Sequence, residues 1–325
     1  METKLNQYLA EINDTIAHIH YPAAPDGLYE PVRYTLSLGG KRIRPLLTLM
    51  GCELFGKYRS EAIAPATAIE IFHNFTLLHD DVMDKAELRR GKPTVHCVWN
   101  ENTAILSGDV MQIMAYKELS KTPQPYLKEV LNLFSKMAAE ICEGQQYDME
   151  FENKTEVSTD DYIMMIRLKT AVLLGCALKI GATIADAPQQ DAELLYRFGE
   201  DLGLAFQLKD DYLDVYGDSR VFGKKIGGDI LNNKKTFMLI SALNNADDTT
   251  RLELNRWIEK KSFNPEEKIA AITRIYNQLG IDCICENEME KRYRNALKSL
   301  QKIQVEEDRK EMLYYLAEQM MKRTV

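Results

Sequence analysis

Apolar residues recur at every third or fourth position along almost the whole chain, and this period limits the fold more than any other feature. Clusters of proline, glycine and polar residues, such as KTPQP at 121–125 and NNADDTT at 244–250, interrupt the pattern. The segments between them run for about 12 to 25 residues, which is the length of ordinary helices. No segment alternates convincingly between apolar and polar residues, as a half-buried strand would. The sequence therefore predicts an all-α protein of roughly ten to thirteen helices.

Length and composition set further limits. The chain has 325 residues and shows no linker or change of composition, so we expect a single domain spanning residues 1–325. Its formal net charge of −8 argues against nucleic-acid binding, because the basic residues form only local clusters. The apolar run 171–178 is too short to span a membrane, and the first residues lack a signal-peptide core. Six scattered cysteines form no zinc pattern, so we expect a soluble, cytoplasmic protein with reduced thiols.

Three aspartates follow an apolar stretch in LLHDDVMD, residues 77–84. On a helix Asp80 and Asp84 lie about 40° apart, whereas Asp81 points about 100° away from Asp80. Two carboxylates about 4 Å apart repel by about 4 kcal/mol at an effective dielectric of about 20, so the pair needs protons, arginines or a divalent cation between them. Taken alone, the motif is more typical of a solvated acidic helix end.

A second DDxxD motif ends another mostly apolar segment, GLAFQLKDDYLD at 203–214. Gln207, Asp210 and Asp214 follow one helical stripe at positions i, i+3 and i+7. Because each motif stands where an apolar helix runs into a loop, the two could face each other across one cavity with metal ions between them. Mg²⁺ suits such a site, because it takes few carboxylates and completes its coordination with water and substrate phosphates.

Positive charge is concentrated in three places near these motifs. GGKRIRP at 39–45 contains a glycine pair that can bring the backbone close to a ligand, and RRGK at 89–92 comes soon after the first acidic motif. A glycine-rich stretch with Lys224, Lys225, Lys234 and Lys235 follows the second motif. Each cluster alone is more typical of a solvated charge run. Together with two carboxylate triads they indicate a site for a multiply charged phosphate anion.

The motifs GGKRIRP, LLHDDVMD, RRGKPT, FQLKDDYLDVYGD and FGKKIGGDI resemble, in the same order, the signature set of the polyprenyl (isoprenyl) diphosphate synthases, a family of trans-prenyltransferases. The resemblance covers essentially the whole chain. It implies a helical bundle around a deep central cavity, the isoprenoid-synthase type of fold, and a homodimer. It also implies Mg²⁺-dependent, head-to-tail condensation of isopentenyl diphosphate onto an allylic diphosphate (dimethylallyl, geranyl or farnesyl), with three Mg²⁺ ions in each active site.

The resemblance also implies roles for individual positions. Asp80, Asp84 and Asp210 would bind the Mg²⁺ ions that hold the allylic diphosphate, with Asp214 beside them in the metal site and Asp81 in support. The same diphosphate would be contacted by Arg89, Lys169, Lys224 and Lys234. Isopentenyl diphosphate would rely on cations alone, namely Lys41, Arg44, His73 and Arg90, with Arg42 as a further candidate. Thr170 and Gln207 match positions that face the reacting carbon.

Simpler explanations exist for three of these residues. His73 lies about 20° from Asp80 on an ideal helix, so it shares that face, but a lone histidine on an apolar helix is more often a core residue. Thr170 could bond back to its own helix, and the Gln207 amide could be a satisfied structural group.

The chain also departs from the common family pattern, because Asn233 replaces a glycine before the late lysine and Lys225 replaces a proline.

Product length is predicted from FHNFTLLHDD, residues 72–81. A growing prenyl tail must run away from the metals, so bulky residues one or two turns before Asp80 can form a floor. Phe75 stands five residues before Asp80, with Phe72 one turn earlier on the same side, although both could be ordinary core aromatics. Relatives with a large aromatic at this fifth position and a small residue such as Thr76 at the fourth tend to stop early. We therefore predict geranylgeranyl diphosphate, with farnesyl diphosphate next.

Two other classes of protein compete with this interpretation. A class I terpene cyclase also ionises an allylic diphosphate, but it would have a second motif with asparagine and serine and no need for the GGKRIRP and His73 cations. A non-catalytic regulatory subunit of a heteromeric prenyl synthase would not need both intact acidic motifs together with all the cations. The sequence reveals no residue that would act as the base for the final proton.

Overall fold

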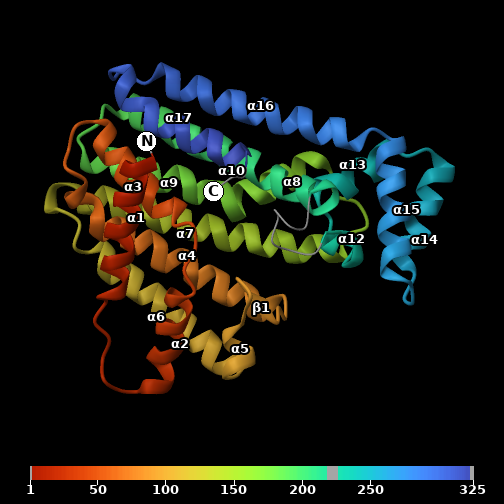
Figure 1. Cartoon of the computed structure of the whole chain (residues 1–325), viewed down its shortest axis with the longest axis horizontal. Coiled ribbons are helices and arrows are strands. Elements are labelled where there is room, and N and C mark those ends of the chain that lie inside the picture. The colour runs from red at the N-terminus through yellow and green to blue at the C-terminus, as the bar shows by residue number, and fades with distance from the viewer. Residues whose placement is uncertain (1, 218–225, 323–325) are drawn as a thin grey trace.

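The computed structural model describes residues 2–217 and 226–322, most of which lie in helices (Figure 1). The first half of the chain contains α1 (Glu2–Ala17), α2 (Asp26–Ser37), α3 (Ile43–Leu54), the 3₁₀ helix η1 (Arg59–Ala62), α4 (Ile63–Met83), α5 (Val95–Val98), α6 (Glu101–Leu119) and α7 (Gln124–Asn153). The second half contains α8 (Thr159–Ile166), the π-helical turn η2 (Arg167–Ala171), α9 (Val172–Ile184), α10 (Gln189–Tyr216), α12 (Gly228–Leu231), α13 (Phe237–Asn245), α14 (Asp248–Glu259), α15 (Pro265–Gln278), α16 (Ile281–Lys302) and α17 (Glu307–Lys322). The prediction of an all-α fold is confirmed.

The described residues contain sixteen α-helices, more than the ten to thirteen predicted. Two of these, α5 and α12, have only four residues each and lie in connections between longer helices. Hydrophobic periodicity cannot reveal them, because a helix of one turn shows no repeat. None of the described helices is both long enough and apolar enough to cross a membrane.

A small hairpin follows α4, made of β1 (Leu88–Arg89) and β2 (Lys92–Pro93) in antiparallel pairing. Its two loop residues, Arg90 and Gly91, have φ angles of 53° and 75°. Positive φ at both central residues is the geometry of a type I′ turn, which matches the twist of two antiparallel strands. The hairpin thereby brings the two arginines of RRGK beside the end of α4.

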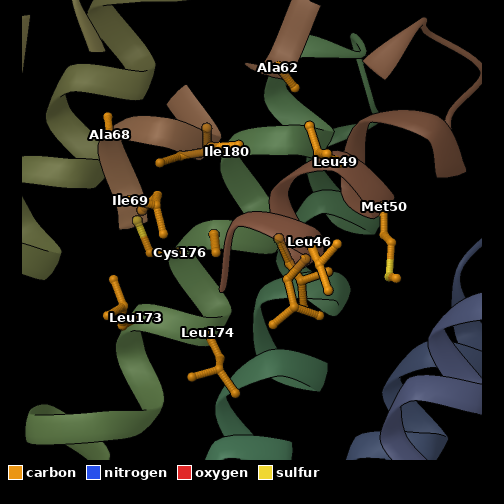
Figure 2. Close-up of a cluster of buried hydrophobic side chains, with 14 of the residues drawn as sticks. Leu46, Leu49, Met50, Ala62, Ala68, Ile69, Leu173, Leu174, Cys176 and Ile180 are labelled. Carbon is orange, nitrogen blue, oxygen red and sulfur yellow. The ribbon is translucent and has the colours of Figure 1, made fainter. Parts of the chain in front are cut away.

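The main core forms where α3, α4 and α9 pack together (Figure 2). The α9 sequence VLLGCALKIGATI is apolar on nearly all sides, which predicts a helix surrounded by others, and twelve of its residues are buried. Side chains in this cluster include Leu46 and Leu49 of α3, Ala68 and Ile69 of α4, and Leu173 and Ile180 of α9. This packing fixes the helices whose ends carry the first acidic motif and Lys169.

The helix α10 joins this core to a second cluster of buried side chains. Its first half contributes Leu195 and Phe198 to the main core, and its second half contributes Leu204 and Leu208 to a cluster with α13, α15 and α16. The long helix α16 runs beside α10, while α14 and α15 stand together at one end of the molecule (Figure 1). The second acidic motif lies in the last two turns of α10, on the side of this second cluster.

Candidate active site

The first acidic motif lies at the C-terminal end of α4. Asp84 caps the helix, and its backbone N–H donates to the Asp80 carbonyl over 2.8 Å. Desolvation, and then the charge of Asp80, raise the pKa of Asp84. Asp81 points elsewhere, as the helical spacing predicts: it is 5% exposed and accepts a hydrogen bond from Arg89 Nε at 2.9 Å. The motif therefore separates into two carboxylates that face the site and one that anchors the hairpin.

Lys169 stands opposite these carboxylates on the π-helical turn η2. Its Nζ lies 3.5 Å from Asp80 Oδ1 and 2.6 Å from Asp148 Oδ2 on α7. A π turn shifts the helix by one residue and often occurs at functional sites. The next residue, Thr170, has its hydroxyl 3.5 Å from Gln207 Oε1 on α10. This single turn therefore connects the first acidic motif with the helix that carries the second.

The helix α8 leads into this turn and starts at a well-defined residue. Ser158 and Asp161 form a capping box, in which the Ser158 side chain accepts from the Asp161 N–H and the Asp161 carboxylate accepts from the Ser158 N–H. On the other side, Gly144 of α7 lies directly against the turn, where a Cβ atom would come within 2.3 Å of Lys169 N. The position of Lys169 is therefore determined by backbone packing.

The second acidic motif divides differently from the first. Asp211 is 3% exposed and accepts hydrogen bonds from the Tyr162 hydroxyl and from Gln207 Nε2, the latter at 3.2 Å. Burial raises the pKa of Asp211 to about 7. Asp214 is also buried and accepts the Asp229 N–H at 3.0 Å, which ties the end of α10 to the start of α12. Asp210, the first residue of the motif, is only partly buried.

The electrostatics of Lys234 show that the two acidic motifs lie close together. The crowded site desolvates its ammonium, which alone would lower the pKa, but surrounding carboxylates outweigh this and raise the pKa of Lys234. These carboxylates belong to Asp229, Asp148, Asp211 and Asp84, in order of decreasing effect. One lysine thus interacts with members of both DDxxD motifs, which lie 126 residues apart when measured from Asp84 to Asp210 (210 − 84).

A second group of cations surrounds His73, two turns before Asp80 on α4. Arg44 Nη1 is 3.0 Å from His73 Nε2, and the Arg90 guanidinium donates to the Gly39 carbonyl and lies against Gly40. Burial, and then the charge of Arg44, keep the pKa of His73 well below its usual value, so the ring is neutral and its Nε2 accepts from Arg44. The Arg44 Nε is buried and has no hydrogen-bond partner among the described residues.

Arg42, a candidate ligand by its motif position, is engaged inside the protein. It is 5% exposed, and its guanidinium donates to Glu70 Oε1 at 2.6 Å, to Asn13 Oδ1 at 3.2 Å and to the Leu36 carbonyl at 2.8 Å. Asn74 also donates to Glu70 Oε1, at 2.9 Å. Because its donors are used by protein acceptors, we assign Arg42 to the support of the start of α3, which carries Arg44.

The aromatic pair ahead of the first motif is part of a larger cluster. Phe72 is fully buried and Phe75 is 8% exposed, with ring centroids 5.3 Å apart. Phe72 also contacts Phe134 of α7 at 5.1 Å, and Phe75 contacts His79 at 4.8 Å. The two phenylalanines therefore form one wall with α7, one to two turns below Asp80.

Two of the predicted lysines lie outside the described residues, and a third is exposed. Lys224 and Lys225 fall in the segment 218–225, outside the described residues, and Lys41 is exposed at the start of its motif.

Sequence reasoning did not identify Asp148, which pairs with Lys169, or Tyr162, which holds Asp211. No motif surrounds either residue. The only local signal is the i, i+4 spacing of Gly144 and Asp148, which places both on the face of α7 that meets η2.

Comparisons with known proteins identify the family of this chain. The polyprenyl synthetase family model matches residues 25–276. The short chain isoprenyl diphosphate synthase of Methanocaldococcus jannaschii is 41% identical over 253 residues, covering 78% of this chain and 77% of that protein. The geranylgeranyl diphosphate synthase of Sulfolobus acidocaldarius is 35% identical over 323 residues, covering 98% and 97%.

Solved structures match over the whole chain. A geranylgeranyl pyrophosphate synthase superimposes with a TM-score of 0.93 at 42% identity, covering 100% of this chain and 99% of that one. A decaprenyl diphosphate synthase from Rhodobacter capsulatus has a TM-score of 0.87 at 29% identity, covering 99% and 98%. A geranylgeranyl pyrophosphate synthase from Corynebacterium glutamicum, complexed with isoprenyl diphosphate and magnesium, has a TM-score of 0.83 at 28% identity, covering 99% and 97%. The chain belongs to the polyprenyl synthetase family, has the all-α isoprenoid synthase fold, and is a trans-prenyltransferase.

Proposed function

We propose that this enzyme condenses isopentenyl diphosphate onto an allylic diphosphate bound between the two acidic motifs. The observation that carries the proposal is the presence of two different anion sites along α4, one at Asp80 and one around His73. One combines the carboxylates of Asp80 and Asp84 with the cations Lys169 and Lys234. The other contains cations and a neutral histidine, grouped around Arg44. Two diphosphates therefore bind by different chemistry, one through metal and one through cations alone.

The acidic site fits Mg²⁺. Asp80 and Asp84 lie one helical turn apart, and desolvation and then the charge of Asp80 raise the pKa of Asp84, so both oppose its ionisation. A divalent cation bound between the two carboxylates would favour the ionised form. Among the described residues no three acidic, histidine or cysteine side chains are close enough to form a metal site by themselves. This suits Mg²⁺, which retains water and takes substrate phosphate oxygens as ligands. Asp80, Asp84 and Asp210 would hold three ions, with Asp214 beside them.

The reaction begins when the carbon–oxygen bond of the allylic diphosphate breaks and its electron pair leaves with the diphosphate. Bound Mg²⁺ supplies charge that stabilises this leaving anion. Lys169 and Lys234 contribute further positive charge at the same place. Arg89 is a further proposed contact, although its guanidinium pairs with Asp81 in the structure. Thr170 and Gln207, whose side-chain oxygens lie 3.5 Å apart, would face the carbon that becomes cationic, and the partial negative charge of these oxygens would stabilise it. Stabilisation of charge that develops only in the transition state accelerates the step directly.

The second substrate then attacks the allylic cation. The π electrons of the isopentenyl double bond form the new carbon–carbon bond, which leaves a cation on the other carbon of that double bond. A proton is then lost from the carbon next to this cation to the departed diphosphate. Arg44, His73, Arg90 and Lys41 hold the diphosphate of isopentenyl diphosphate, and the hydrogen bond from Arg44 to His73 keeps two of these groups side by side. A closed, dry pocket protects the cation from water.

The direct test is incubation of the purified protein with Mg²⁺, radiolabelled isopentenyl diphosphate and each allylic primer. We expect labelled linear diphosphates longer than the primer by whole five-carbon units. Release of a cyclised hydrocarbon without incorporation of label would indicate a terpene cyclase. A folded protein that makes neither product alone would point to a regulatory subunit and would contradict the proposal.

The product is geranylgeranyl diphosphate, with farnesyl diphosphate as a second candidate. The buried Phe75 and Phe72 lie below the first acidic motif, where they would stop the tail. Phe75→Ala should open this floor and lengthen the product, because each added isoprene unit would then bury more apolar surface. Chromatography of the dephosphorylated products measures the shift, and Phe75→Leu, which retains most of the bulk, should shift it less. The role of Phe75 would be refuted if the wild type makes products of about thirty carbons or more, or if Phe75→Ala leaves the distribution of product lengths unchanged.

A homodimer is supported by an exposed apolar face on α6. Ile105, Leu106 and Ile113 are 45%, 59% and 66% exposed, although the other side of the same helix is buried. A helix that is apolar on both sides is normally covered on both, and a second copy of this chain would provide the cover. In sedimentation equilibrium we expect the wild type to be a dimer and the Ile113→Asp variant to be a monomer. The matched change Leu252→Asp, at a 60% exposed leucine of α14, should leave the dimer intact. A monomeric wild type would disprove the assignment.

We also propose that residues 1–325 form one catalytic domain and that the enzyme works in the cytoplasm. The first proposal is supported by α10, which contributes to both clusters of buried residues. The second is supported by the cysteines, because all six are unpaired, as is usual in a reducing compartment.

A further inference from the structure

Lys268, in the second turn of α15, is a buried lysine whose burial is not explained by an ion pair. It is 0% exposed, and it forms no ion pair with a carboxylate in residues 2–217 and 226–322. Its place near the start of a helix is electrostatically unfavourable, because the N-terminal end of the helix dipole is positive. Burying an unpaired ammonium is also costly. The contacts that this charge does make therefore need an explanation.

Those contacts lead to the loop that carries Lys234. The Lys268 Nζ donates to Asn233 Oδ1 at 2.6 Å and to the Leu231 carbonyl at 3.3 Å, and it lies 4.2 Å from the centre of the Phe263 ring. Two of the three neighbours thus belong to residues 231–233, directly before Lys234. The ammonium of Lys268 fastens this short connection between α12 and α13 to α15.

Asn233 is held from two sides. Its Oδ1 accepts from Lys268, and its Nδ2 donates to the Ile258 carbonyl at the end of α14 over 3.0 Å. Its backbone has a φ of 53°, in the left-handed region, which asparagine tolerates better than most residues and which glycine adopts without strain. Asn233 therefore adopts this backbone turn and also adds a side-chain clamp between α14 and α15.

We propose that Lys268 and Asn233 are positioning residues that hold Lys234 at the allylic diphosphate. Lys234 follows the clamp directly, its N–H donates to the Asp229 carbonyl at 2.9 Å, and its ammonium interacts with carboxylates of both acidic motifs. A long, flexible lysine side chain loses much entropy when it is held in place, so a rigid backbone beneath it lowers the cost of binding. The inference rests on the proposed contact between Lys234 and the allylic substrate.

The test is a set of variants in the full-length enzyme, with Michaelis constants measured for each substrate separately. Lys268→Met keeps the length and apolar stem of the side chain while removing its charge. We expect the Michaelis constant for the allylic diphosphate to rise about tenfold. The variant loses a hydrogen bond from a charged group to Asn233, the residue directly before Lys234. The constant for isopentenyl diphosphate should stay within about twofold, because the side-chain hydrogen bonds of Lys268 and Asn233 lead to Leu231 and Ile258 and not to Arg44 or His73.

Two further variants separate positioning from general stability. Lys310→Met is a matched control, because Lys310 is also buried, at 1% exposed, but within residues 2–217 and 226–322 its ammonium donates only to the Gln301 carbonyl of α16 and to Glu307 of α17. It should leave both Michaelis constants unchanged. Asn233→Gly keeps the left-handed backbone and removes the clamp, so it should raise the allylic constant by about fivefold to tenfold without unfolding the protein. Because the two residues share one hydrogen bond, the effect of the double variant should be smaller than the sum of the two single effects.

Binding of inorganic diphosphate with Mg²⁺, measured by calorimetry, gives a readout independent of turnover, and it should weaken in parallel with the allylic constant. Lys234→Ala serves as the reference. If Lys234→Ala leaves the allylic Michaelis constant unchanged, the proposed role of Lys234 is wrong and this inference is overturned with it. If Lys234→Ala raises the constant while folded Lys268→Met and Asn233→Gly do not, or raise both constants equally, the positioning role alone is overturned.

Discussion

Asp80→Ala is expected to reduce turnover by on the order of 10³-fold while the protein remains folded. Asp80 is the residue at which the first acidic motif meets Lys169, whose Nζ lies 3.5 Å from its Oδ1. Its loss would remove a proposed metal ligand from the place where the leaving diphosphate develops charge. It would also leave Asp84 to bind Mg²⁺ alone from this motif. Asp80 is on the helix surface facing the site, so we expect little change in stability.

The measurement is the turnover number at saturating Mg²⁺ with both substrates, together with circular dichroism to establish folding. Asp160→Ala, at an exposed aspartate in the first turn of α8, controls for the loss of one negative charge. Its turnover should be normal. Near-normal activity of folded Asp80→Ala would exclude Asp80 from the metal site.

Gly144→Ala is expected to lower turnover by about 10²-fold, although residue 144 has no functional group of its own. An added Cβ would lie 2.3 Å from Lys169 N, 2.7 Å from Lys169 Cα and 2.8 Å from Leu168 C. All three are backbone atoms, so either α7 or the turn η2 must move. Lys169 would then leave its positions beside Asp80 and Asp148, and a displacement of about 1 Å in a catalytic group is enough for a loss of this size.

Active-site titration is needed here, because the clash also destabilises the protein, by about 1–3 kcal/mol. The quantity to compare is therefore the turnover number per folded enzyme. Gly27→Ala is the matched control, because an added Cβ in α2 would meet nothing within 4 Å and alanine favours a helix. A folded Gly144→Ala enzyme with wild-type turnover would mean that the π turn tolerates movement and that its exact position is unimportant.

Sequence reasoning worked where a residue's environment follows from its neighbours along the chain. The helical wheel separates Asp81 from Asp80, and in the structure Asp81 turns away to bind Arg89. The same wheel brings His73 to the face of Asp80, and His73 lies beside Arg44. Both are consequences of a fixed rise and rotation per residue, which an isolated sequence already contains.

It worked less well where a residue's role depends on which helix lies opposite. Arg42 stands in a motif of cations, yet it is buried against Glu70, because the chain turns left-handed at that residue and directs the side chain inward. Asp148 belongs to no motif and becomes important only through contact with Lys169, 21 residues later. The short helices α5 and α12 were missed because one turn contains no repeat.

By itself, the sequence of this protein determined its all-α class, its two acidic motifs and the cations that accompany them. These follow from local composition and helical period, which depend only on residues within a few turns of each other. Only the tertiary structure decided that Lys234 interacts with carboxylates of both motifs, that Gly144 supports Lys169, and that Lys268 holds Asn233. Such pairings join residues from different helices, and their geometry is set by packing of the whole core, which no local pattern encodes.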